Sequence, residues 1–275
     1  MYRIVAKKEL APAVKSLTID APLVAKNARP GQFIIVRIDE KGERIPLTIA
    51  GLDVQQGTIT TIFLEVGKTT EQLGRLNEGD AISDLAGPLG NPTEIKNYGR
   101  VVCVGGGVGV APLYLVAKAL KDAGNEVISI IGARTKELLI FEDEMQQASD
   151  ELYIATDDGS KGHHGFVTDV LQELIAKQKI DRVLAVGPTV MMRAVAKVTK
   201  NHNIKTVVSL NPLMVDGTGM CGACRVTVGG ETKFTCVDGP EFDAHLVDFE
   251  ELMNRQRTYI TEEKVALERC GRCRH

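Results

Sequence analysis

The residues best suited to chemistry lie in the last third of the chain, in the stretch DGTGMCGACRVTV that begins at Asp216. Cys221 and Cys224 stand three positions apart in it, and Cys236 follows twelve positions later. Cysteines spaced in this way are typical of a loop that holds a 2Fe–2S cluster through thiolates. Asp216 stands five positions before Cys221, where one more ligand would complete the set.

Asp216 has two possible roles. A carboxylate carries the same formal charge as a thiolate but is a harder donor, so it could replace a cysteine and favour ferric iron. Gly217, Gly219 and Gly222 would then let the backbone wrap the cluster and donate N–H groups to its sulfides. Alternatively, Asp-Gly simply marks a turn, and the fourth ligand is another thiol.

Cys270 and Cys273 supply that other thiol. Together with Cys221 and Cys224 they form two CxxC pairs, the arrangement of a structural zinc site. The pairs are far apart in the sequence, and Cys236 would have no role in such a site. The pattern therefore favours an iron–sulfur centre with Asp216 as a ligand, while zinc stays open as an alternative.

The elements that must position these residues fall into regions of different texture. Residues 1–98 contain short alternating or β-branched runs broken by turn signals, which predicts an antiparallel barrel or sandwich. Residues 99–206 alternate apolar runs with helical stretches, as a doubly wound parallel sheet does. Residues 207–247 are rich in glycine and cysteine, and residues 248–275 are strongly charged.

A glycine-rich turn opens the second region. The strand VVCV continues into GGGVGVAPL, with glycines 105, 106, 107 and 109 leading into a helix expected to begin near Pro112. Bare backbone there can approach a pyrophosphate, and the helix N-terminus offers unpaired N–H groups. The turn therefore predicts a dinucleotide site, although its GxGxxP pattern departs from the ordinary fingerprint and a purely structural turn is the alternative.

Composition excludes several classes of partner. The net charge is −3 and no lysine or arginine block occurs, so nothing indicates binding to nucleic acid or to an anionic membrane. The N-terminus has no apolar core of a signal peptide, and the longest uncharged run, 101–117, is too short to span a bilayer. Five of the six cysteines lie at or beyond Cys221, and in the cytoplasm that we expect, such thiols bind metal rather than pair as disulfides.

Three segments of the second region carry a family resemblance. GGGVGVAPL, GARTKELLIFEDE at 132–144 and VGPTVMM at 186–192 resemble the pyridine-nucleotide domain of the ferredoxin reductase-like flavoenzymes. The first domain of that family is a flavin-binding barrel. Similar segments occur in residues 1–98, namely ARPGQF (28–33), RIPLT (44–48), LEVGKTTEQL (64–73) and GPLGNP (87–92).

The resemblance implies an FAD site on the barrel. In the family an RxYS-type motif borders the flavin ring, which makes Thr48 the hydroxyl nearest flavin N5 and the catalytic candidate. Ile45, not Arg44, aligns with the arginine of that motif, although the resemblance still lets Arg44 reach the flavin phosphate. The implied flavin-binding residues are Arg44, Pro46, Leu47, Thr48, Gly67, Thr69 and Thr70.

The resemblance also implies a nicotinamide nucleotide site. Arg134 ends the second strand and could accommodate a 2′-phosphate, but Asp157 and Asp158 would repel one and could accept hydrogen bonds from a ribose diol. NAD(H) is therefore favoured, with a polar turn as the alternative role of the aspartates. The implied residues are Gly105, Gly106, Gly107, Gly109, Pro112, Arg134, Asp157, Asp158 and, lining the nicotinamide pocket, Gly187, Pro188 and Met191.

Two groups of the family also carry a C-terminal 2Fe–2S loop: the electron-transfer subunits of dihydroorotate dehydrogenase and the small subunits of NADH-dependent reduced ferredoxin:NADP oxidoreductase, or sulfide dehydrogenase. Asp216, Cys221, Cys224 and Cys236 occupy the ligand positions of that loop, and the aspartate resembles the second group. The implied function is electron transfer between NAD(H), FAD and the cluster.

The resemblance implies a larger flavoprotein partner with 4Fe–4S clusters, joined in a heterodimer and contacting ferredoxin indirectly. Residues 248–275 would suit docking to it, or form a solvated helix and tail. The dihydroorotate type is the alternative within the family. From another class, the alternative is a non-catalytic redox sensor with a zinc site.

Overall fold

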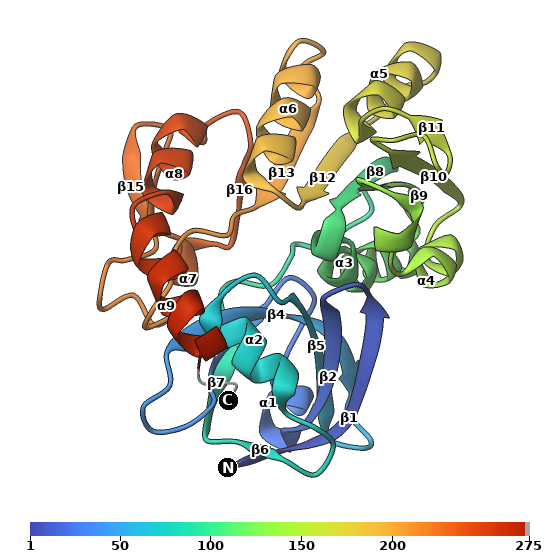
Figure 1. Cartoon of the computed structure of the whole chain (residues 1–275). Coiled ribbons are helices and arrows are strands. Elements are labelled where there is room, and N and C mark those ends of the chain that lie inside the picture. The colour runs from blue at the N-terminus through green and yellow to red at the C-terminus, as the bar shows by residue number, and fades with distance from the viewer. Residues whose placement is uncertain (273–275) are drawn as a thin grey trace.

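The computed structural model of the protein describes residues 1–272 (Figure 1). The N-terminal part is a nearly closed antiparallel barrel with strand order β6-β1-β2-β5-β4-β3-β7. Its elements are β1 (Tyr2–Ala11), β2 (Val14–Asp20), α1 (Pro22–Asn27), β3 (Phe33–Arg37), β4 (Arg44–Asp53), β5 (Thr58–Leu64), α2 (Lys68–Arg75), β6 (Ala81–Ile82) and β7 (Asp84–Leu89). The expected flavoenzyme-type barrel is present.

The middle part is a sheet with strand order β11-β10-β9-β8-β12-β13, all parallel. Chain order reverses between β8 and β12, and in such sheets ligands bind beyond the carboxyl ends of the strands at that point. The strands are β8 (Arg100–Gly106), β9 (Glu126–Ala133), β10 (Glu151–Thr156), β11 (His163–His164), β12 (Arg182–Val186) and β13 (Lys205–Ser209). The helices are η1 (Gly107–Gly109), α3 (Val110–Asp122), η2 (Lys136–Leu138), α4 (Glu142–Ala148), α5 (Val167–Lys177) and α6 (Thr189–Lys200).

Helices cover the two faces of this sheet with different partners. On one face α3 and α4 share an apolar core with β1, β2, β4 and β5 of the barrel. On the other, α5 and α6 share a core with β14 and α8 of the C-terminal part. The sheet is thus buried between the two other parts of the molecule, which fixes its carboxyl edge relative to both.

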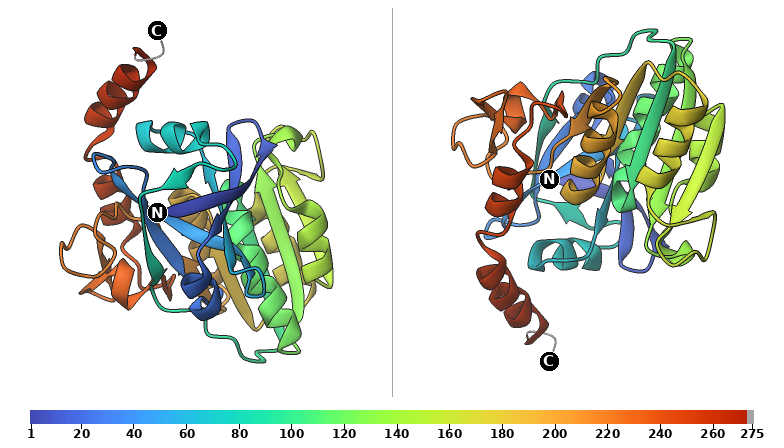
Figure 2. Two further views of the ribbon diagram at one scale, coloured as in Figure 1. Left: turned by 90° about the horizontal axis from the view of Figure 1, so that it is seen from below. Right: turned by 90° about the horizontal axis from the view of Figure 1, so that it is seen from above.

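The C-terminal part consists of β14 (Arg225–Val228), β15 (Glu231–Phe234), α7 (Thr235–Asp238), β16 (Glu241–Asp243), α8 (Phe249–Gln256) and α9 (Ile260–Arg272). Strand β16 pairs antiparallel with β13 and so extends the middle sheet, whose last parallel strand crosses the boundary expected at residue 206. Helix α9 projects beyond the rest of the C-terminal part and ends near the C-terminus (Figure 2), and its last turn contacts α2 of the barrel. Within residues 1–272 no helix is long and apolar enough to cross a membrane.

Candidate functional site

The glycine turn and the GPTVMM segment meet at the carboxyl edge of β8 and β12. A Cβ on Gly106 would lie 2.5 Å from Met191 Sδ, and a Cβ on Gly109 would lie 2.5 Å from the Val186 carbonyl oxygen. A Cβ on Gly187 would lie 2.8 Å from Met191 Cε. These glycines let two loops of the chain pack closely against each other. The sequence pattern had instead attributed the same glycines to the close approach of a cofactor.

Gly107 differs from its neighbours. Its φ is +53°, and a Cβ there would meet no atom within 4 Å among the described residues. It is the position in the turn where backbone faces open space and a phosphate could approach. Helix α3 follows from Val110, two residues earlier than expected, so Pro112 lies within its first turn, where its missing N–H costs no helical hydrogen bond.

Arg134 and the aspartates come together at the ends of β9 and β10. The N–H groups of Asp157 and Asp158 donate to the carbonyls of Ala133 and Arg134, both at 3.2 Å. Asp158 Oδ1 accepts from Ser160 Oγ at 2.6 Å and from Ser160 N at 3.0 Å, which lowers the pKa of Asp158. Asp158 therefore closes its own turn, as the alternative role requires, whereas Asp157 is exposed.

The predicted flavin residues on β4 divide between two faces. Leu47 points into the barrel core, which leaves only its main chain for the outer face. Pro46 and Thr48 lie opposite Ile35 and Phe33 of β3, and residues paired in this way share a face. Since α3 packs against β4 and η1 against β5, the nucleotide edge also adjoins this part of the barrel. The structure thus brings Thr48 and the glycine turn into one region.

The start of α2 holds the other predicted flavin residues. Gly67 is the N-cap, and Thr70 Oγ1 accepts from Gly67 N at 3.0 Å, so Thr70 caps the helix. Thr69 Oγ1 donates to Glu43 at 2.5 Å, and Lys68 Nζ donates to the same carboxylate at 3.0 Å. These bonds, Thr69 foremost, lower the pKa of Glu43. The sequence analysis did not single out Glu43. Its carboxylate accepts from Lys68 and Thr69, so the donors at the start of α2 can bind an anionic group.

Two of the four predicted cluster ligands lie together. Cys224 Sγ and Cys236 Sγ are 3.2 Å apart and both thiols are buried. Burial, together with the Cys224 thiol, raises the pKa of Cys236 to about 12, while the Gly219 N–H donates to its sulfur. The Thr235 hydroxyl beside Cys236 is buried with no hydrogen-bond partner among residues 1–272. The two adjacent thiols and the unpaired Thr235 hydroxyl fit a site for a bound group that carries charge and hydrogen-bond acceptors.

Asp216 and Cys221 are less closely placed. Asp216 Oδ2 accepts from Thr218 N at 2.9 Å and from the Thr218 hydroxyl, which lowers the pKa of Asp216. Cys221 is exposed on the same glycine-rich loop. In the described part of the chain no three His, Cys, Asp or Glu side chains stand close enough to hold a metal. The four predicted ligands are of the chemical types that an iron–sulfur cluster binds. Cys224 and Cys236 already lie together, whereas Asp216 and Cys221 lie on the adjoining loop.

Strand β3 lies between the predicted flavin residues of β4 and the buried thiols, an arrangement that the sequence analysis missed. Ile34 and Val36 point into the barrel, whereas Phe33 and Ile35 form an outer core with Met214 and the two buried thiols. The β-branched run FIIVR predicted a strand, and a nearly continuous apolar run is typical of a strand covered on both faces, but the pattern does not show which segment covers the outer face. The face carrying Thr48 therefore continues directly onto the thiol pair.

The zinc alternative gains no support from the described residues. Arg75 Nη2 of α2 donates to Cys270 Sγ at 3.4 Å, so Cys270 lies against the barrel helix rather than beside the buried thiols. Cys273 lies outside the described residues. Cys103, at 0% exposure within β8, is the core thiol expected from VVCV.

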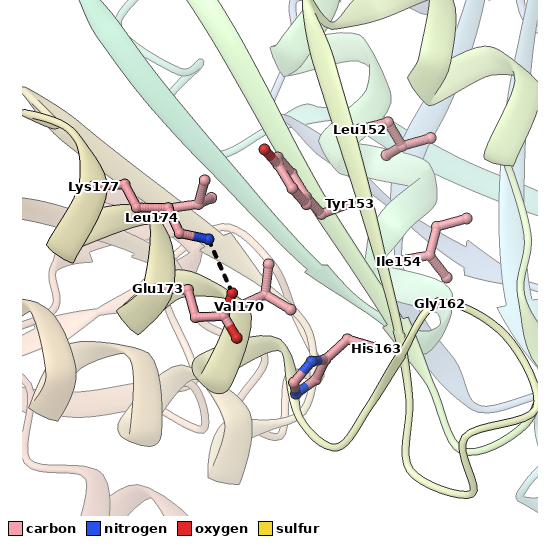
Figure 3. Close-up of a pocket in the computed structure, with 9 residues that line it drawn as sticks. All are labelled: Leu152, Tyr153, Ile154, Gly162, His163, Val170, Glu173, Leu174 and Lys177. Atoms are coloured by element: carbon pink, nitrogen blue, oxygen red, sulfur yellow. Dashed lines mark hydrogen bonds and ion pairs between the residues drawn. The ribbon is translucent and has the colours of Figure 1, made fainter.

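A separate pocket of about 360 Å³ lies between β10 and α5 (Figure 3). It is lined by Leu152, Tyr153, Ile154, Gly162, His163, Val170, Glu173, Leu174 and Lys177. Lys177 and Glu173 form an ion pair at its rim, with 3.2 Å between Nζ and Oε2. None of the predicted site residues lines it, so it is not the candidate site.

Comparisons with known domains agree with this geometry. Residues 211–248 match the iron–sulfur cluster binding domain of dihydroorotate dehydrogenase B, and residues 103–197 match the oxidoreductase NAD-binding domain. The first range contains all four predicted cluster ligands, and the second contains the glycine turn and the GPTVMM segment.

Among full-length relatives, the chain is 52% identical to the dihydroorotate dehydrogenase B (NAD(+)) electron transfer subunit homolog of Thermotoga maritima, covering 98% of this chain and 95% of that protein. A solved structure of NADH-dependent reduced ferredoxin-NADP oxidoreductase, described for flavin-based electron bifurcation, shares 51% identity with a TM-score of 0.93, over 98% and 97% of the two chains. Ferredoxin NADP+ reductase of Neisseria gonorrhoeae, at 16% identity and a TM-score of 0.59 over 73% and 89%, shares the fold.

These comparisons confirm the expected combination of reductase fold, NAD-binding domain and iron–sulfur domain, and with it an oxidoreductase subunit that uses FAD, NAD(H) and a 2Fe–2S cluster. The chain belongs to the family of dihydroorotate dehydrogenase B-type electron-transfer subunits, within the ferredoxin reductase-like flavoenzymes.

Proposed function

We propose that this chain moves electrons between NAD(H), FAD and a 2Fe–2S cluster and delivers them to a larger subunit of the ferredoxin:NADP oxidoreductase type. One observation carries the proposal: the outer face of β3 and β4 bears Thr48 at one point and packs on Cys224 and Cys236 at another. Flavin supplies hydride exchange with nicotinamide and release of single electrons, which no side chain can provide.

The chain's own part is binding and orientation. Gly107 and the start of α3 would receive the pyrophosphate of NAD(H), and Met191 would line the nicotinamide pocket with Gly187 and Pro188. Thr48 would present its hydroxyl to flavin N5, and Gly67 with Thr69 would hold the flavin phosphates. Contact between α3 and β4 supports this assignment, because it fixes the nucleotide edge against the flavin strand.

Asp216, Cys221, Cys224 and Cys236 would hold the cluster. The buried thiol pair and the Gly219 N–H bond to Cys236 support the assignment of the cysteines. For Asp216, the ionised carboxylate uses Oδ2 to hold its own turn, and Oδ1 has no hydrogen-bond partner among residues 1–272. Turn formation and ligation therefore need not compete.

The partner we propose is a flavoprotein bearing 4Fe–4S clusters, which forms a heterodimer with this chain and meets ferredoxin itself. We propose residues 248–275 as the docking segment; helix α9, which projects in Figure 2, supports this for residues 260–272. Helix α8 packs on α6 and β14 instead. We place the complex in the cytoplasm, where reduced thiols remain available for iron. The dihydroorotate alternative predicts orotate formation when the chain is mixed with that catalytic subunit.

Anaerobic reconstitution tests the assignment. The chain should bind flavin, iron and labile sulfide in a ratio of about 1:2:2, and NADH should bleach both the flavin and the cluster absorbance. A colourless chain with stoichiometric zinc would overturn the proposal and favour the redox-sensor alternative.

Nucleotide choice provides a second prediction. Asp157→Ala should lower the ratio of kcat/KM for NADH to that for NADPH by about tenfold or more, because one hydrogen bond to a charged group contributes about 1.5–3 kcal/mol. Asp143→Ala, which removes an equal charge from the exposed first turn of α4, is the matched control. An unchanged ratio in both variants would leave Asp157 as a turn residue only.

A further inference from the structure

Arg44 lies at the junction of the barrel and the cluster loop. It begins β4, two residues before Pro46 on the same outer face. We propose that Arg44 is a positioning residue for the iron–sulfur centre. Its guanidinium holds the cluster loop by the backbone of Val215 and Asp216, and its positive charge raises the reduction potential of the cluster. This inference rests on the proposed function and replaces the flavin phosphate as the target of Arg44.

The contacts are specific. Arg44 Nε donates to the Val215 carbonyl at 3.1 Å, and Nη2 donates to the Asp216 carbonyl at 3.2 Å. Two N–H groups of one planar fork thus bind two successive peptide carbonyls, across 172 positions of sequence. The fork fixes both the position and the orientation of the peptide that bears the Asp216 side chain.

The next residue is also held against the barrel. Gly217 has φ +83°, and a Cβ there would lie 2.6 Å from Ile35 Cγ1 and 3.0 Å from Leu89 Cδ1. The loop is therefore seated on β3 and β7 at one side of the peptide and tied to β4 by Arg44 at the other. These two restraints fix the backbone of Asp216, although its side chain is only half-buried.

Charge gives Arg44 a second effect. Reduction adds one negative charge to the cluster, and a guanidinium one peptide away from a ligand stabilises that charge. Arginine stays protonated throughout the working pH range, so this contribution does not titrate. Removing the charge should make the cluster harder to reduce.

Within the described part of the chain, Arg44 takes no part in the contacts at the start of α2. Glu43 and the residues Lys68 and Thr69 already form a charge-balanced set there, and none of them contacts Arg44 through a hydrogen bond within residues 1–272. The adjacent Glu43 and Arg44 therefore serve different parts of the molecule, one facing the helix start and the other facing the cluster loop.

The test compares three variants of the reconstituted full-length chain. Arg44→Gln removes the charge and the fork, and Arg44→Lys keeps only the charge. Arg37→Gln is the matched control, since Arg37 is the register partner of Arg44 on β3 but binds Asp84 and the Glu40 carbonyl instead. Flavin, iron and sulfide contents, the electron paramagnetic resonance spectrum of the reduced cluster and its potential are measured for each.

The Arg44→Gln variant should still bind flavin. The equilibrium constant for reduction of its cluster should fall at least about tenfold, which lowers the reduction potential by about 59 mV for a one-electron step. Its spectrum should shift or broaden as Asp216 loses its fixed backbone. Arg44→Lys should retain most of the potential but show the same broadening, and Arg37→Gln should match the parent chain.

Two results would overturn the inference. Loss of flavin with an unchanged cluster in both Arg44 variants would return Arg44 to the flavin phosphate. If the spectrum and the potential were unchanged in both Arg44→Lys and Arg44→Gln, the bonds from Arg44 to the Val215 and Asp216 carbonyls would have no effect on the cluster. Either outcome leaves the proposed function intact, whereas a parent chain without labile sulfide would refute the proposed function itself.

Discussion

Replacing Cys236 by alanine should abolish the iron–sulfur centre while leaving the flavin bound. Loss of a supporting hydrogen bond around a metal costs 10–100-fold in affinity, so loss of a buried ligand should cost at least about 100-fold, and labile sulfide should fall to background. Cys236 is 3% exposed and its sulfur lies 3.2 Å from that of Cys224, so no other thiol can take its place without moving the loop. Iron and sulfide analysis with the visible spectrum measures the effect.

Cys103→Ala is the control for this experiment. Cys103 is also a buried thiol, and burial raises its pKa to about 12, but it lies inside β8 within the core beneath α3. Its replacement leaves a small cavity that should cost roughly 1 kcal/mol of stability, with cluster content unchanged. If Cys236→Ala kept its sulfide and spectrum, the ligand assignment would be wrong, even if the chain still bound flavin.

Gly109→Ala should cause the largest loss in the reaction with NADH. The added Cβ would lie 2.5 Å from the Val186 carbonyl oxygen and 2.8 Å from Gly187 Cα, both main-chain atoms that cannot rotate away. The GPTVMM segment must therefore shift, and displacement of a reacting group by about 1 Å can cost on the order of 100-fold. We expect kcat/KM for NADH to fall by about that factor, with roughly 1–3 kcal/mol of stability lost to overpacking.

Gly79→Ala separates the two effects. Gly79 has φ +93° in the turn before β6, and a Cβ there would meet no described atom within 4 Å. Backbone strain should therefore cost about 1–2 kcal/mol without moving any loop of the site. Stopped-flow reduction of the flavin by NADH should be normal in Gly79→Ala and slow in Gly109→Ala. Equal rates would mean that Gly109 serves folding alone.

Local patterns were sufficient for much of this protein. The alternation of the barrel segments, the strand and helix periods of the middle region, and the glycines that follow VVCV all depend on near neighbours in the chain, because side-chain period and turn chemistry are local. The spacing of Cys221, Cys224 and Cys236 likewise indicated an iron–sulfur loop before any contact was known. Resemblance then supplied the roles of Thr48 and the α2 start, which remain predictions.

Only the tertiary structure decided how these parts meet. Whether Gly106 and Gly109 serve a cofactor or a neighbouring loop depended on Met191 and Val186, which lie about 80 positions away. The outer face of β3, the pairing of β16 with β13 and the hold of Arg44 on the Asp216 peptide are likewise contacts between distant segments. A sequence pattern records which face of an element is apolar but not which segment covers it, because that depends on the packing of the whole chain.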